Sequence, residues 1–169
     1  IQSPRGMSIM EVYEIYRKNI LLVNRRYQRK LVWALDEKKE LAESILLGYP
    51  IPLILLANTK DEKYEIIDGM QRLNAIFGFI ENQFPILIDG KHKYFNIPDF
   101  PFAQTQVKNG FVVSADRDNN FITQEQVSQF IQYQLPVTIF KSGSEHEINE
   151  TFRRLNSTGR KLSAQEVRQ

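Results

Sequence analysis

The chain has 169 residues, of which 42% are apolar and 25% are charged, and its formal net charge is +2. This composition is typical of a globular protein and excludes an intrinsically disordered chain. Cysteine is absent, which excludes disulfides and thiolate metal sites and is typical of an intracellular protein.

No apolar run approaches the roughly 20 residues that cross a bilayer. The first ten residues, IQSPRGMSIM, lack the pattern of a secretory signal peptide. We therefore expect a cytoplasmic protein with no membrane partner. Because the chain starts with isoleucine and ends where a helix begins, we also expect it to be the N-terminal part of a longer protein.

Capping-box patterns mark several helix starts. In a capping box, the first and fourth side chains satisfy each other's backbone donors. Four such patterns begin at Ser8, Thr123, Ser144 and Ser163. A further helix, DEKKELAESILLG, is expected to be capped by Asp36 and to stop at Gly48 in a left-handed conformation.

The middle of the chain predicts strands around one helix. The run IPLILLA (51–57) is typical of a buried strand, and YEII (64–67) makes a partner for it. Residues 68–81 predict a helix, and FPILIDGKHKYFNI predicts a hairpin around Asp89-Gly90. A long loop (98–120), a helix (123–133), a strand (135–140) and a helix (145–156) follow. We expect a single α+β domain over 1–169, with 98–134 as an elaboration.

The first candidate site is the strand-to-helix junction IIDGMQRL (66–73). Gly69 permits a tight turn and close approach of a ligand, and the amides that open the helix favour an anion. Arg72 would add a two-pronged donor for phosphate, and Asp68 could hold Mg²⁺, orient Arg72 or position a water molecule. The alternative is plain capping, with Asp68 as N-cap and Gln71 as its partner.

Two further stretches are candidates. Residues 25–33 (RRYQRKLVW) mix basic and aromatic side chains, which suits phosphate contact and base stacking but also a basic surface strand. Residues 156–159 (NSTG) form a turn that could cradle an anion or simply connect two helices. Both histidines, His92 and His146, lie outside any metal-site spacing, and no GxSxG motif predicts a serine hydrolase.

Taken together, four ordered stretches resemble one family. It is the ParB/sulfiredoxin-like domain at the N-terminus of GmrSD-type modification-dependent restriction proteins and related bacterial anti-phage proteins. The stretches are YQRKLVW (27–33), SILLGYPIP (44–52), DGMQRL (68–73) and FRRLNSTG (152–159), the last followed by Leu162, Ser163 and Glu166. The chain departs from the family's Asp-Gly-Gln-Gln-Arg signature at Met70, and Lys30 stands where proline usually follows Gln-Arg.

The resemblance implies a fold and a function. The fold is an α+β ParB/sulfiredoxin-like domain with a small mixed sheet, surrounding helices and an inserted segment. The function is binding, and hydrolysis, of a nucleoside triphosphate with Mg²⁺, which would gate a nuclease in a C-terminal domain absent from this chain. Hydrolysis would be weakened here if the glutamine replaced by Met70 contacts nucleotide or water.

The resemblance also implies site residues. The catalytic group is Asp68, Gln71 and Arg72, with Asp68 also as metal ligand, and the nucleotide-binding group is Gln28, Arg29, Gly69, Asn156, Ser157, Thr158 and Gly159. An alternative function is a non-catalytic module that binds DNA or senses its modification, which would show a steep salt dependence. A structural or oligomerisation domain is a third possibility, and the sequence leaves the oligomeric state open.

Overall fold

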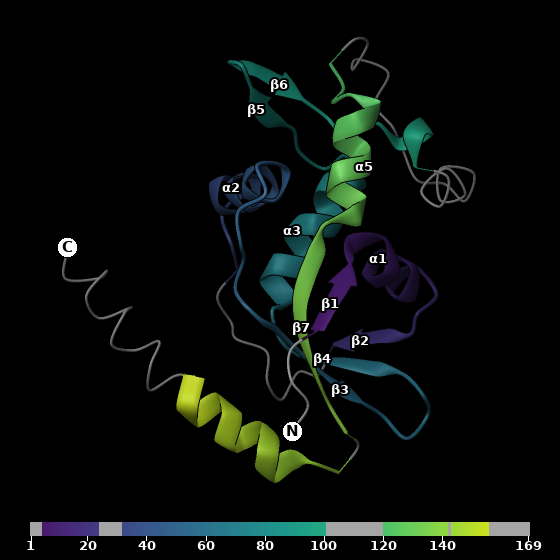
Figure 1. The fold of residues 1–169 in the computed structure, drawn as a ribbon, viewed down its shortest axis with the longest axis vertical. Coiled ribbons are helices and arrows are strands. Elements are labelled where there is room, and N and C mark those ends of the chain that lie inside the picture. Colours follow the sequence, from purple (N-terminus) through teal and green to yellow (C-terminus); the bar gives the residue numbers. More distant parts are fainter. Residues whose placement is uncertain (1–4, 24–31, 101–119, 142, 156–169) are drawn as a thin grey trace, which may run out of the picture.

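The protein is built on one five-stranded mixed sheet. The structure, a computed structural model, describes residues 5–23, 32–100, 120–141 and 143–155 (Figure 1). The sheet has the order β1-β7-β3-β4-β2. Its strands are β1 (Arg5–Ser8), β2 (Leu21–Val23), β3 (Ile54–Asn58), β4 (Tyr64–Asp68) and β7 (Gln134–Phe140).

Pairing within the sheet alternates in direction. β1 runs antiparallel to β7, β7 parallel to β3, β3 antiparallel to β4, and β4 parallel to β2. The register of β3 against β4 shifts between Leu55 and Leu56, beside the end of β4. Such irregularities change the direction of the side chains beside them. Here the shift lies opposite Asp68, the first residue of the junction between β4 and α3.

The helices divide between the two faces of the sheet. The larger core joins one face of the sheet to α1 (Ile9–Arg17), α2 (Leu35–Leu46), α3 (Met70–Ile80) and α5 (Gln124–Gln132). The other face carries a smaller cluster in which Ile148 of the helix 145–155 packs against β3, β4 and β7, with Phe152 partly buried beside it. Figure 1 shows this yellow-green helix apart from the other helices.

Several predicted elements are confirmed. The expected β3–β4 pair is antiparallel, and the hairpin of β5 (Ile86–Ile88) and β6 (Lys91–Lys93) turns at Asp89 and Gly90, both at positive φ. Capping boxes form at Ser8 and Thr123, and Gly48 stops α2 at φ +80°. The fold is therefore α+β, as the sequence indicates, while the finer ParB/sulfiredoxin-like assignment stays a prediction.

The start of α2 differs from the prediction. Ala34 and not Asp36 is the N-cap, and the Glu37 carboxylate accepts a hydrogen bond from the Ala34 amide at 3.1 Å. A glutamate three residues after the N-cap can accept the hydrogen bond of the N-cap amide even when the N-cap residue has no capping side chain. The helix therefore begins before Asp36.

The inserted segment is only partly described. A short 3₁₀ helix, η1 (Ile97–Asp99), opens it, and α5 closes it. Backbone pairing between Tyr94 and Phe121 joins the chain just after β6 to the chain just before α5. The expected loop lies mainly in 101–119, outside the described residues, as does the predicted helix start at Ser163.

Candidate functional site

The junction between β4 and α3 is shaped by Gly69. This residue is the N-cap of α3 at φ +107°, a left-handed conformation that favours glycine. A β-carbon there would lie 3.0 and 3.2 Å from the two γ-carbons of Ile54. Because Ile54 fills that space, a ligand would not approach through the missing side chain, and the glycine serves the turn and the packing.

The capping alternative for Asp68 is wrong. Gly69 occupies the N-cap position, and no side chain caps this end of α3. The first helical bond runs from the Leu73 amide to the Gly69 carbonyl at 2.9 Å. The amides of the first turn precede that bond, so they retain the donor character typical of a helix N-terminus.

Asp68 and Arg72 form an ion pair at this junction. The Arg72 Nη2 lies 3.5 Å from Asp68 Oδ2 and donates a hydrogen bond to the Leu53 carbonyl at 2.8 Å. Asp68 is 36% exposed and Arg72 is 16% exposed. Of the three roles considered for Asp68, its orientation of Arg72 is the one this geometry displays.

Gln71 links the junction to the second predicted stretch. Its Oε1 accepts a hydrogen bond from the Trp33 backbone amide at 3.2 Å. The Trp33 side chain is partly buried and packs against the large core. Trp33, at the end of the stretch 27–33, thus contacts Gln71 of the stretch 68–73.

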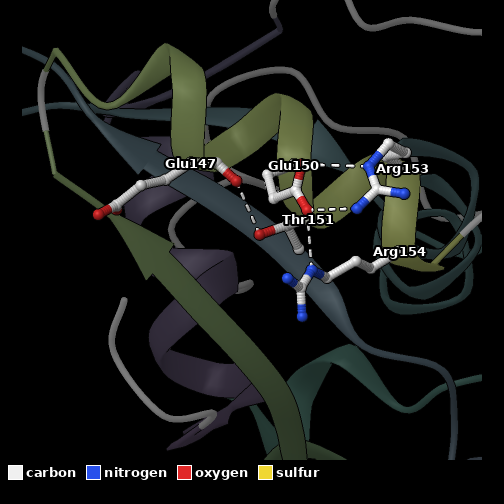
Figure 2. A network of polar contacts seen from close by, with 5 residues as sticks. All are labelled: Glu147, Glu150, Thr151, Arg153 and Arg154. Atoms are coloured by element: carbon white, nitrogen blue, oxygen red, sulfur yellow. Dashed lines mark hydrogen bonds and ion pairs between the residues drawn. The ribbon is translucent and has the colours of Figure 1, made fainter.

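The remaining predicted site residues lie outside the described part of the chain. They are Gln28, Arg29, Asn156, Ser157, Thr158 and Gly159. The helix 145–155 directly precedes Asn156, Ser157, Thr158 and Gly159 in the chain. Near its end, the Glu150 carboxylate accepts hydrogen bonds from both Arg153 and Arg154 (Figure 2).

A cavity of about 240 Å³ lies elsewhere, between the β3–β4 turn and the start of the helix 145–155. Its polar lining includes Lys60, Lys141 and Glu65. None of the residues that line it belongs to the predicted site. Over the part of the chain that the structure describes, no group of three or more His, Cys, Asp or Glu side chains is arranged to hold a metal ion.

A buried polar cluster at the far end of α3 escaped the sequence-based prediction. Glu81 Oε2 accepts hydrogen bonds from the Tyr13 hydroxyl and from Arg17 Nη1, both at 3.0 Å. Burial raises the pKa of Glu81 above its usual value, although the two donors oppose that shift. Burial and the neighbouring Glu81 also raise the pKa of Tyr13. Sequence offers no signal for this cluster, since Glu81 lies more than 60 positions from both of its donors.

Comparison with known proteins identifies one family. The model of the family described as "GmrSD restriction endonuclease, N-terminal domain" matches residues 12–169. A search among curated proteins found no match. None of the described helices is long and apolar enough to cross a membrane.

Proposed function

The chain belongs to the GmrSD restriction endonuclease family, whose N-terminal domain it matches, and we propose that it binds a nucleoside triphosphate at the β4–α3 junction. The family places the protein in restriction and anti-phage defence. The observation that carries the nucleotide proposal is the Asp68–Arg72 pair at the opening of α3.

The junction offers the chemistry that phosphate needs. The first-turn amides of α3 and the helix dipole favour negative oxygens. The Arg72 guanidinium adds a planar donor, and its bond to the Leu53 carbonyl fixes the side chain beside Asp68. The partly exposed Asp68 keeps Arg72 oriented until phosphate oxygens take over part of its hydrogen bonding.

The other nucleotide contacts follow from the family resemblance. Gln28 and Arg29 precede Trp33, whose amide is bonded to Gln71, so the described end of their stretch lies beside the junction. The Asn156–Gly159 turn would close the pocket. These residues stay predictions, because they lie outside the described part of the chain.

A magnesium ion bound with the triphosphate would use Asp68 as its carboxylate ligand and would neutralise phosphate charge. Met70, which replaces the signature glutamine, is partly packed against the large core, and its thioether supplies no hydrogen-bond donor. We therefore propose that this chain retains triphosphate binding and that its triphosphate hydrolysis is weakened. Binding would gate a nuclease carried elsewhere in the full protein.

A thermal-shift screen of the four ribonucleoside triphosphates, with and without magnesium, tests the proposal first. A ligand that binds only the folded chain raises its melting temperature. Titration calorimetry then compares wild type with Arg72→Gln. We expect the variant to lose at least about tenfold in affinity, since a charge-assisted hydrogen bond contributes about 1.5–3 kcal/mol.

Arg5→Gln is the matched control. It removes an exposed arginine on β1, the edge strand on the side of the sheet away from β4. This variant should bind the triphosphate as wild type does. The proposal is overturned if no triphosphate shifts the wild-type melting temperature, or if Arg72→Gln binds with undiminished affinity.

A further inference from the structure

The helix 145–155 presents a fixed outer surface. Its inner side is anchored by Ile148, which is buried against Leu55, Ala57, Ile67 and Phe140 of the sheet, and by the partly buried Phe152. Because these contacts fix the helix about its axis, the side chains on its other side point away from the sheet.

Two arginines lie on this outer surface near the end of the described part of the helix. Arg153 and Arg154 are 67% and 75% exposed. Glu150 accepts bonds from Arg153 Nε at 3.1 Å, Arg153 Nη2 at 2.5 Å and Arg154 Nε at 2.9 Å. Figure 2 shows both guanidiniums converging on this single carboxylate, while the Glu147 side chain points away from them.

Helix stabilisation explains part of the arrangement. A glutamate three or four residues before an arginine favours the helix, and cations favour its C-terminal end. The charges do not balance, however, because one carboxylate faces two guanidiniums. Hydrogen bonds from Arg153 and Arg154 lower the pKa of Glu150 to about 2. One carboxylate and two guanidiniums, all ionised at neutral pH, leave these three side chains with one net positive charge.

We infer that Arg153 and Arg154 form a contact surface for the phosphate backbone of DNA, and that Glu150 holds both guanidiniums in place while competing with phosphate for them. Each guanidinium has five donors, and the three bonds to Glu150 leave most of the ten for an incoming anion. Surface ion pairs are weak, so a phosphate displaces the carboxylate easily.

A polyanion suits this surface better than a small nucleotide. Small ligands bind in concave sites that bury most of their surface. The arginine pair is exposed two turns along the helix, whereas the described cavity lies at the N-terminal end of the helix. Backbone phosphates bind exposed cations through counterion release and need no enclosed pocket. The inference is independent of the triphosphate proposal.

The test measures binding of a short fluorescent duplex DNA to the 169-residue chain over a series of salt concentrations. Arg153→Gln combined with Arg154→Gln removes both charges and keeps long, helix-compatible side chains. We expect weaker binding and a salt slope smaller by about two, one unit for each lost phosphate contact.

Glu150→Gln makes the prediction sharper because its effect has the opposite sign. Removing the competing carboxylate should tighten DNA binding and increase the salt slope. A general loss of folding would weaken binding in every variant, so tighter binding cannot arise from it.

Lys38→Gln combined with Lys39→Gln is the matched control. These consecutive lysines lie on α2, a helix that packs in the larger core on the other side of the sheet, and the change in net charge is the same. The inference is overturned if this control weakens DNA binding as much as the arginine variant does, or if Glu150→Gln fails to tighten it. It is also overturned if the arginine variant loses affinity for a triphosphate and not for DNA.

Discussion

Each end of α3 is flanked by an arginine–carboxylate pair, and the two pairs differ in their N–O distance and in the exposure of the carboxylate. At the C-terminal end, Arg17 and Glu81 are 3.0 Å apart, the Tyr13 hydroxyl donates a second bond to Glu81, and Glu81 is 8% exposed. At the N-terminal end, Arg72 and Asp68 are 3.5 Å apart and Asp68 is 36% exposed.

This difference indicates that the Arg17–Glu81 pair stabilises the fold, whereas the Arg72–Asp68 pair is able to bind a ligand. A buried carboxylate with two donors has little to gain from a ligand, and losing either donor is costly. A longer pair whose carboxylate is partly exposed contributes less to folding, so its arginine can exchange the carboxylate for phosphate. The comparison predicts that the two pairs respond very differently to the same substitution.

The largest expected effect is that of Glu81→Ala. It leaves the fully buried Tyr13 hydroxyl and Arg17 without their shared acceptor, and we expect a loss of about 3–4 kcal/mol in the free energy of unfolding. The matching variant Asp68→Ala should cost less than about 1 kcal/mol. Urea denaturation of both variants measures the contrast, and equal losses would contradict the assignment of the two pairs.

The next effect concerns the turn that places Asp68 and Arg72. Gly69→Ala introduces a β-carbon at positive φ and against Ile54, and we expect a loss of about 2–3 kcal/mol. In the control Gly90→Ala, φ is +76° and no atom lies within 4 Å of the added carbon. The control should cost about 1 kcal/mol, for strain alone. If both variants lose the same amount in thermal or urea denaturation, Ile54 does not restrict this turn.

The sequence predicted α3 and its neighbours because their patterns are local. The buried faces of α3, with Leu73, Ile76, Phe77 and Ile80, follow the helical period, and turn chemistry identifies the β5–β6 hairpin. The strands β1 and β2 were missed because they are only four and three residues long. Their formation depends on pairing with β7 and β4, which no local pattern contains.

The candidate site was predicted in its location but not in its internal contacts. Asp68 and Gln71 have the spacing of a capping pair, yet the tight packing of Gly69 on Ile54 makes glycine the N-cap. Gln71 instead bonds the Trp33 amide, 38 residues away in sequence. Long-range contacts of this kind are set by tertiary packing, so the residue types and their spacing do not reveal them.

The pH dependence of stability tests the Arg17–Glu81 pair through a smaller expected effect. Burial raises the pKa of Glu81 above its ordinary value of 4.5. The folded state therefore holds this proton more tightly than the unfolded state, and wild type should lose stability as the pH rises above 4.5 through the raised value. Glu81→Gln keeps an acceptor oxygen for Tyr13 and should lack this loss.

Denaturation of wild type and Glu81→Gln across this pH range gives the comparison. Asp68→Asn, the same exchange at the other end of α3, controls for the removal of one negative charge. A stability difference between wild type and Glu81→Gln that stays constant, or that grows in favour of wild type as the pH rises, would contradict the raised pKa.

The smallest expected change in stability comes from Gln71, and its main signal is spectroscopic. Trp33 is the only tryptophan in the chain, so its fluorescence reports on the bond between its amide and Gln71 Oε1. Gln71→Met preserves length but removes the acceptor, and we expect a loss of about 0.5–1 kcal/mol with emission shifted to longer wavelength. Gln71→Glu retains an acceptor oxygen and should keep the wild-type spectrum. Identical spectra for the two variants would show that Gln71 does not position the segment entering α2.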